Sequence, residues 1–318
     1  MKKILVTHHL PQKAFEDIKG KYEVIIPDNG MIDTSMVNKW IEVCDALLPT
    51  YAFKVTSEVI DRATNLKIIA NFGAGYDNID IAYAGAKGIL VTNSPAPVIE
   101  PTAELAFALL LNVARRVSEC DRNLRLPQGI KINVMKNLGV GIYGKILGIV
   151  GMGAIGQALA KRAHACGMKI VYHNRKQLPR EIEEKLEAQW IGLDELLTTA
   201  DVVSLHAPAT PETYHLIDAP QLALMKPTAI LINTTRGSLI NEQALISVLR
   251  ERKIFGAGLD VFENEPRISP ELFELNNVVL SPHNGTGTID ARIASTRYAL
   301  QNIINFFEGK EVLSPVHL

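Results

Sequence analysis

Short runs of β-branched and aliphatic residues alternate with segments of helical period along almost the whole chain. Because such runs are each followed by a segment able to form a helix or a turn, we predict parallel strands joined by crossover connections. In the first third of the chain the predicted strands lie near Lys3–Val6, Glu23–Ile26, Ala46–Leu48, Ile68–Ala70 and Leu90–Thr92. These runs are enough for a small doubly wound sheet.

The proline-rich segment 93–97 interrupts this pattern, since proline disfavours helix at its own position and at the preceding residue. A long apolar helix is predicted from Glu100 to Arg116, and a second strand series begins at Ile146–Val150. A final amphipathic helix, Ile289–Phe307, has no strand after it and is expected to pack on the first sheet. We therefore predict an α/β fold with two domains, residues 1–98 with 288–318, and residues 99–287.

Composition narrows the classes of partner. The 318 residues are 47% hydrophobic, and 33 Lys and Arg stand against 34 Asp and Glu, so the basic excess of nucleic-acid binders is missing. The apolar run from Ala103 to Val113 is shorter than the roughly 20 residues of a membrane span. Neither a secretory signal, a disulfide framework nor a metal site is predicted. We expect a cytoplasmic protein that binds small molecules, without nucleic acid, membrane or metal.

A glycine motif follows the strand that ends at Val150. Gly151, Gly153 and Gly156 match G-x-G-x-x-G, with Ala154 and Ile155 inside the motif at the start of a helix. In this context the glycines permit a tight turn, a close approach to a pyrophosphate and close packing of helix on strand. A glycine-rich turn without ligand is the alternative. We interpret the motif as the dinucleotide site of a Rossmann domain.

The next predicted strand, Lys169–Tyr172, ends without the acidic residue that accepts hydrogen bonds from an NAD ribose. Asn174 stands in its place, and Arg175 and Lys176 follow. Because these cations can bind a 2′-phosphate, the sequence favours NADP over NAD. The alternative is that Arg175 and Lys176 belong to an ordinary solvated loop.

Polar residues follow three further predicted strands, Ala229–Ile232, Gly258–Phe262 and Asn277–Leu280, at the sheet edge where ligands collect in open α/β sheets. Reduction of a 2-oxo acid requires a cation for the carboxylate and carbonyl, and an acid that protonates the oxygen. Arg236 supplies a planar guanidinium and His283 an acid or base, while Glu265, if hydrogen-bonded to His283, favours the imidazolium. Taken singly, Arg236 is equally compatible with a surface ion pair, and His283 with a structural loop residue.

The motifs together resemble those of the D-isomer-specific 2-hydroxyacid dehydrogenase family over nearly the whole chain. The segments that carry the resemblance are 71–80, 151–156, 205–208, 225–227, 236–237, 260–266 and 282–283. The resemblance implies that Arg236, Glu265 and His283 are catalytic, with Arg236 binding substrate and His283 acting as acid or base. It implies a flavodoxin-like substrate domain that is smaller than the Rossmann domain.

The resemblance also assigns binding residues. It implies that backbone N–H groups around Gly73, Ala74 and Gly75 hold the substrate carboxylate, as a glycine-rich anion nest can. Tyr51 lies on a loop that selects substrates in such enzymes, although a packing role is as plausible. The residues implied near the nicotinamide are Thr234, Arg236, Asp260 and His283, and those along the outer cofactor are Ala207 and Pro208. His206 is expected to be structural or to lie on the adenosine side.

The sequence departs from the family pattern at Ala154, where arginine is common, and at Asn284, which is polar. A tryptophan common before Gly144 is missing. The match looks closest to glyoxylate and hydroxypyruvate reductases, so we expect an enzyme that reduces a small 2-oxo acid to the D-2-hydroxy acid. It also implies a homodimer, with the helix near Thr102 as a candidate contact. The alternatives are a dehydrogenase for a bulkier 2-oxo acid and a nicotinamide-sensing protein without turnover.

Overall fold

The computed structural model describes residues 1–317 and divides into two compact units. Unit 1 comprises Met1–Pro101 and the chain from Thr286 onward, and unit 2 comprises Thr102–Gly285. Sequence analysis places the boundaries at residues 98 and 288, within three residues of these bounds. The chain therefore leaves unit 1 once and returns to it.

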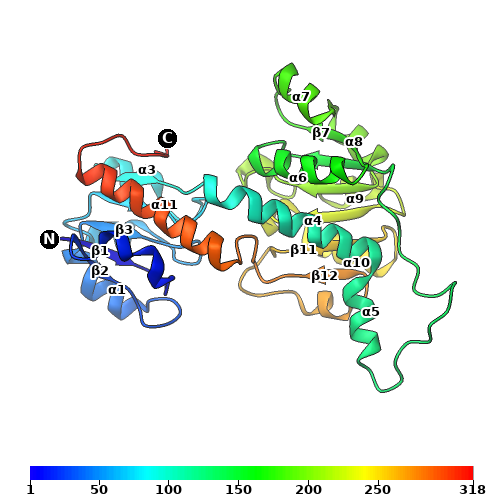
Figure 1. Cartoon of the computed structure of the whole chain (residues 1–318), viewed down its shortest axis with the longest axis horizontal. Coiled ribbons are helices and arrows are strands. Elements are labelled where there is room, and N and C mark those ends of the chain that lie inside the picture. Colours follow the sequence, from blue (N-terminus) through cyan, green and yellow to red (C-terminus); the bar gives the residue numbers. More distant parts are fainter. Residues whose placement is uncertain (318) are drawn as a thin grey trace. The chain divides into compact units, whose positions relative to one another are not determined.

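Unit 1 contains a sheet whose strands are all parallel (Figure 1). The order β2-β1-β3-β4-β5 is that of flavodoxin-like folds, in which ligands gather beyond the carboxyl ends of the strands. The strands are β1 Lys2–Val6, β2 Tyr22–Ile25, β3 Ala46–Leu48, β4 Ile68–Ala70 and β5 Leu90–Thr92. The predicted strands of this region are thus confirmed to within one residue at each end.

Helices cover both faces of this sheet, because strand residues that alternate along the chain enter two separate cores. Leu5 belongs to one cluster, while Ile4 and Val6 belong to the other, together with Leu300 and Ile303 of α11. The helices are α1 Thr34–Trp40, α2 Ser57–Arg62, α3 Ile81–Ala86 and α11 Ile289–Phe307. Helix α11 packs on β3 and β4, as the sequence predicts for this amphipathic segment.

Unit 2 contains a larger parallel sheet in the order β12-β11-β10-β9-β6-β7-β8, which is the Rossmann order extended by one strand. Its strands are β6 Ile146–Val150, β7 Lys169–His173, β8 Ala188–Trp190, β9 Val202–Leu205, β10 Ile230–Asn233, β11 Gly256–Leu259 and β12 Val278–Leu280. The predicted fold class, two doubly wound α/β sheets, is confirmed.

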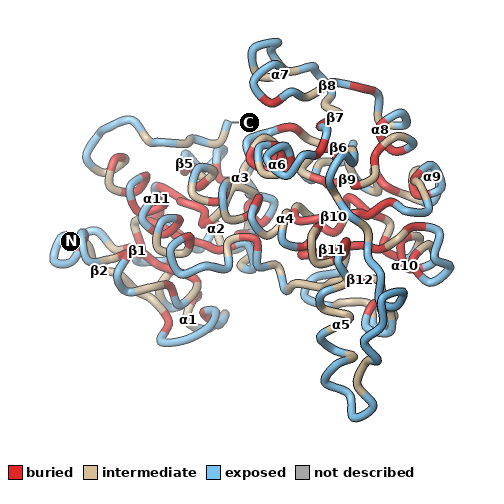
Figure 2. The backbone as a smooth tube through the Cα atoms, turned by 45° about the vertical axis from the view of Figure 1, so that its right-hand side comes forward, coloured by how far each residue is buried: buried red, intermediate tan, exposed pale blue. Residues whose placement is uncertain are grey.

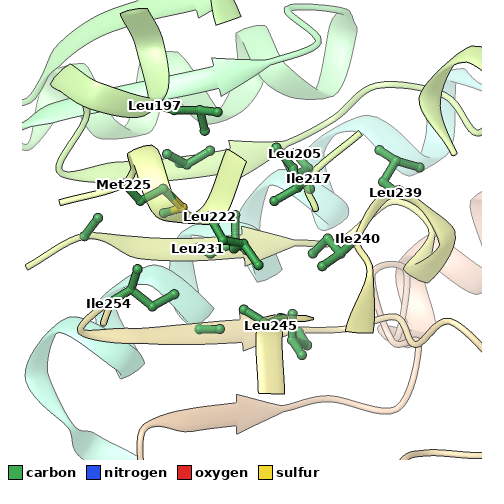
Figure 3. Close-up of a cluster of buried hydrophobic side chains, with 14 of the residues drawn as sticks. Leu197, Leu205, Ile217, Leu222, Met225, Leu231, Leu239, Ile240, Leu245 and Ile254 are labelled. Carbon is green, nitrogen blue, oxygen red and sulfur yellow. The ribbon is translucent and has the colours of Figure 1, made fainter. Parts of the chain in front are cut away.

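The helices of unit 2 are α4 Ile99–Arg115, which begins in unit 1, α5 Val117–Leu124, α6 Ala154–Ala165, α7 Arg180–Leu186, α8 Leu193–Thr199, α9 Ala219–Leu224 and α10 Glu242–Arg250. Leucine and isoleucine side chains of α8, α9 and α10 pack with those of the strands in one buried cluster (Figure 3). Helix α4 is long and apolar enough to cross a membrane by length and composition. One of its faces is buried, however, and Leu109 and Val113 lie against the glycines of β11, as in a core helix.

Strand β11 begins two residues earlier than the sequence predicts and ends at Leu259 rather than near Phe262. A methyl group on Gly256 would lie 2.5 Å from the Asn277 oxygen, and one on Gly258 would lie 2.9 Å from Ile232. The strand therefore needs glycine, which isolated strand preferences disfavour. Packing against α4 and the neighbouring strands overrides the local preference.

Candidate active site

The three motif glycines stand at the turn between β6 and α6, and each meets a different steric demand. Gly151 has a φ of +97°, and a Cβ there would lie 2.4 Å from the Ala207 nitrogen. At Gly156 a Cβ would lie 2.6 Å from the Gly151 oxygen, whereas one at Gly153 would meet nothing within 4 Å. The turn and the helix packing are thus tight, while space is open where Gly153 caps α6. This cradle fits a dinucleotide pyrophosphate.

Asn174, at the end of β7, supports this turn. Its Oδ1 accepts a hydrogen bond of 2.7 Å from the Met152 N–H, so the side chain holds the glycine turn in place. Arg175 and Lys176 follow on an exposed loop. Arg175 also lies within electrostatic range of Glu212, whose pKa is lowered first by hydrogen bonding to Thr210 and more weakly by Arg175.

His206 follows β9 and lies beside Gly151, since a methyl group on Gly151 would also contact the His206 carbonyl carbon. Its Nε2 is 2.8 Å from the Ser204 hydroxyl, and its Nδ1 is enclosed without a hydrogen-bond partner in residues 1–317. Burial lowers the pKa of His206 to about 4, so the ring is uncharged at neutral pH. An uncharged, enclosed ring agrees with the structural or adenosine-side position expected from sequence.

His283 and Glu265 are in direct contact. The His283 Nδ1 is 2.7 Å from Glu265 Oε2, and Oε1 of the same carboxylate accepts a 2.8 Å bond from the Phe262 N–H. His283 has a φ of +51°, a left-handed conformation that is uncommon outside glycine and often marks functional positions. The carboxylate therefore orients the ring from the Nδ1 side.

Arg236 lies in the same cluster, at the turn after β10. Asn233 holds that turn by donating 2.9 Å to the Arg236 carbonyl. A Cβ on Gly237 would lie 1.9 Å from the Phe262 carbonyl carbon, so glycine lets the Arg236 turn contact the segment that leads to Glu265. The three predicted catalytic residues are brought together, although they are separated by up to 47 positions in sequence.

The pKa of Glu265 depends on both of the other predicted catalytic side chains. Burial raises its pKa, but the hydrogen bond and charge of His283, the Phe262 N–H and the charge of Arg236 outweigh burial and hold the pKa below its usual value. Glu265 is therefore ionised at neutral pH. An ionised carboxylate, an imidazole and a guanidinium can bind a carboxylate substrate and transfer a proton to or from it.

Two further predicted residues, Thr234 and Asp260, have buried oxygen atoms beside this cluster. Asp260 Oδ1 accepts a 2.7 Å bond from the Asn284 N–H. In the part of the chain that is described, neither Asp260 Oδ2 nor Thr234 Oγ1 has a hydrogen-bond partner. Burial raises the pKa of Asp260 despite that bond. Buried polar atoms without partners are expected where a polar ligand group binds, such as a carboxamide.

In unit 1, the segment Gly73, Ala74 and Gly75 follows β4, and Gly73 has a φ of +125°. The carbonyl groups of this loop are held from within the unit by Ser94, Asn93 and Asn71, which donate to residues 73, 74 and 75 over 2.8, 2.8 and 2.6 Å. None of the three loop N–H groups donates to an acceptor within residues 1–317. The loop thus has the form of an anion nest. Tyr51 follows β3 and is 37% exposed.

A second histidine–glutamate pair was not singled out by sequence analysis. His215 Nε2 is 2.7 Å from Glu263 Oε1, and the other Glu263 oxygen accepts from the Glu242 N–H. Glu263 lies two residues before Glu265, which is a sequence signal that could have identified it. Its bond to the first turn of α10 indicates that the pair braces the catalytic segment.

A cavity of about 390 Å³ lies elsewhere in unit 2, where strands β10 to β12 begin. It is lined by residues such as Arg116, Glu119 and Arg252, and it contains none of the predicted site residues. No cluster of three or more potential metal ligands occurs among residues 1–317. The predicted site residues of unit 2 lie instead beyond the carboxyl ends of its strands.

Comparisons with known proteins agree with this geometry. Residues 107–285 match the family described as D-isomer specific 2-hydroxyacid dehydrogenase, NAD binding domain. A glyoxylate reductase of Thermococcus litoralis is 46% identical over 318 residues, which cover 97% of this chain and 94% of that protein.

Solved structures are similar over their full length. A Thermus thermophilus protein superposes with a TM-score of 0.92 at 41% identity, covering 99% of this chain and 100% of that one. An NADPH-dependent glyoxylate/hydroxypyruvate reductase of Sinorhizobium meliloti was solved with NADP and malonate. It gives a TM-score of 0.85 at 31% identity, and the match covers 99% of this chain and 96% of that one.

Proposed function

Because this chain belongs to the D-isomer-specific 2-hydroxyacid dehydrogenase family and is an NAD(P)-dependent oxidoreductase, we propose that it reduces glyoxylate to glycolate and hydroxypyruvate to D-glycerate. The observation that carries the proposal is the 2.7 Å contact of His283 with Glu265, with Arg236 in electrostatic range. Relatives named as glyoxylate reductases support the choice of substrate.

The cofactor is proposed to bind at the glycine turn. The pyrophosphate is held by the turn at Gly151, Gly153 and Gly156 and by the N–H groups of Ala154 and Ile155, which have no partner within the helix. Arg175 and Lys176 bind the 2′-phosphate, so NADP is preferred to NAD. Asn174 holds the turn through its Oδ1, which accepts from the Met152 N–H, and its Nδ2 donates to the ribose.

At the other end of the cofactor, Thr234 and Asp260 offer their unpaired oxygens to the carboxamide, while Ala207 and Pro208 line the outer part. The bound dinucleotide supplies the hydride that reaches C2 of the substrate. The proposed roles of this chain are to bind the acid, to polarise its carbonyl group and to deliver one proton.

The proton is proposed to come from His283. Since Glu265 engages Nδ1, the transferable proton is on Nε2, which protonates the carbonyl oxygen as the C2–H bond forms. Glu265 holds the ring in position through Nδ1, and Arg236 stabilises the negative charge that develops on oxygen. In the oxidative direction the neutral ring removes the hydroxyl proton.

The substrate carboxylate is proposed to bind to the N–H groups of Gly73, Ala74 and Gly75, with Tyr51 limiting the size of the C3 substituent. A bulkier 2-oxo acid is the alternative substrate within the same chemistry. A sensor without turnover is the alternative of a different class, but it has no need for a proton donor oriented by a carboxylate. We further propose a cytoplasmic homodimer that binds neither nucleic acid nor membranes.

The test is the oxidation of NADPH and of NADH, followed by absorbance, with glyoxylate, hydroxypyruvate and longer 2-oxo acids. We expect the highest kcat/KM with NADPH and the two smallest acids, and a loss of about 10³-fold in kcat for His283→Ala. Replacing Arg175 with Gln should lower kcat/KM with NADPH relative to kcat/KM with NADH.

The His283→Ala protein should still bind the dinucleotide, which a fluorescence titration measures. Cofactor binding without reduction of any acid by the unaltered chain would favour the sensor. A ratio of kcat/KM that favours NADH would contradict the proposed role of Arg175.

A further inference from the structure

Arg292 is a cation without an anionic partner in the described part of unit 1. It lies in the first turn of α11, and its guanidinium stacks over the ring of Phe72, 5.6 Å from the ring centroid. The residue is half-buried, yet within residues 1–317 its side chain makes neither an ion pair nor a hydrogen bond. The donors of this guanidinium are therefore available to an anion.

Two polar residues stand beside this guanidinium. The ring of His8, after β1, has its Nδ1 2.8 Å from the hydroxyl of Thr50, after β3. Burial, and then the charge of Arg292, lower the pKa of His8, which indicates that the two side chains are close. At neutral pH the His8 ring is therefore uncharged and can donate a hydrogen bond, while Arg292 supplies the positive charge.

The cluster lies at the same sheet edge as the anion nest. Phe72, on which Arg292 stacks, directly precedes Gly73, and His8, Thr50 and Phe72 follow strands β1, β3 and β4. This edge of unit 1 thus carries two separate anion-binding features, one made of backbone N–H groups and one made of side chains. A monocarboxylate occupies only one of them.

We propose that Arg292, His8 and Thr50 bind the second carboxylate of a 2-oxo dicarboxylic acid, so that this enzyme also reduces such acids. The inference rests on the proposed function, in which the nest binds the first carboxylate of the substrate. The redox chemistry is unchanged: the hydride goes to C2, the proton goes to the carbonyl oxygen, and the second carboxylate does not react.

The test compares 2-oxosuccinate and 2-oxoglutarate with glyoxylate in the native chain and in Arg292→Gln. We expect the variant to lose at least about tenfold more kcat/KM for a dicarboxylic acid than for glyoxylate, mainly through KM, as expected for one lost charge-assisted bond. Arg292→Lys, which keeps the charge, should restore part of the difference. Arg297→Gln is the matched control, because it removes a positive charge from an exposed position on the same helix.

Several results would overturn the proposal. One is equal losses for glyoxylate and the dicarboxylic acids, accompanied by a lower unfolding temperature, because Arg292 would then be structural. Another is a native enzyme that reduces glyoxylate but neither dicarboxylic acid. If no 2-oxo acid were reduced, the proposed function would fail separately. Calorimetric titration with 2-oxosuccinate would still decide the inference, since equal affinity of the native and Arg292→Gln proteins would contradict it.

Discussion

The carboxylate of Glu265 orients His283. It accepts a hydrogen bond from the Nδ1–H, which leaves Nε2 to exchange a proton with substrate. Its second oxygen is held by the Phe262 N–H, so the carboxylate is itself oriented. Such an orienting partner acts through the histidine, and its loss reduces the rate without removing the proton donor.

Replacing Glu265 with Gln should therefore lower kcat for glyoxylate by about 10 to 100-fold with a smaller change in KM. The lowered pKa of Glu265 means that the folded protein binds fewer protons at this site than the unfolded chain. The carboxylate thus contributes stability above its unfolded pKa of about 4.3, and loses it as the pH falls through the lower folded value.

Thermal unfolding of the native chain and of Glu265→Gln over a pH series measures this contribution. The native chain should unfold at a higher temperature than Glu265→Gln near neutral pH, and this difference should disappear in acid. A constant difference at all pH values would contradict the assigned ionisation of Glu265.

At the scale of elements, the turn from β6 to α6 shows how one motif combines folding and binding. The glycine at 151 is required by the close approach of the segment after β9, whereas the glycine at 153 leaves open space in front of a helix N-terminus. Replacing Gly151 should lower the stability of the fold, whereas replacing Gly153 should weaken ligand binding.

We predict that Gly151→Ala destabilises the fold by about 1–3 kcal/mol or more, because it combines a clash with an unfavourable positive φ. Gly153→Ala should unfold near the native temperature but bind NADPH at least about tenfold more weakly, as its methyl group enters the space needed by the pyrophosphate. Thermal unfolding and fluorescence titration measure the two effects.

Gly192→Ala is the matched control for this pair. Gly192 also caps a helix, with a φ of −65°, and a Cβ there meets nothing within 4 Å. This variant should leave both measurements unchanged. Normal NADPH affinity in Gly153→Ala would exclude the glycine turn as the pyrophosphate site.

At the scale of the whole molecule, an exposed apolar segment suggests that the chain does not act alone. Residues 125–145 after α5, here called the arm, contain no helix or strand and extend from the sheet of unit 2 (Figures 1 and 2). Ile132, Val134 and Tyr143 on the arm are 98%, 89% and 85% exposed. Clustered exposed apolar side chains mark interfaces, and a second copy of the same chain is the commonest partner.

We therefore expect the native protein to sediment as a dimer, and Ile132→Glu combined with Val134→Glu to shift it to a monomer. Phe273→Glu, at a residue that is 64% exposed in the same unit but outside the arm, serves as the control and should remain dimeric. Analytical ultracentrifugation distinguishes these species. A monomeric native protein, or an unaffected double variant, would contradict the role of the arm.

Much of the fold can be predicted from local patterns in the sequence. Strand positions, the α/β class and the glycine turn depend on periodicity and on residue types whose backbone preferences act over a few positions. Strand β11 is the exception, because its glycines are selected by contacts with α4 and with neighbouring strands. The positions of Arg236, Glu265 and His283 at strand ends also follow from sequence, as does their family resemblance.

Tertiary structure alone decided which of these groups meet and in what state. The His283–Glu265 contact, the ionised Glu265 and the uncharged His206 arise from burial and from contacts between distant segments, which no local pattern encodes. The same holds for Arg292, which reads as an ordinary helix residue until folding places it on Phe72 and beside His8. Charge and hydrogen bonding act through space, so their outcome depends on the packed chain.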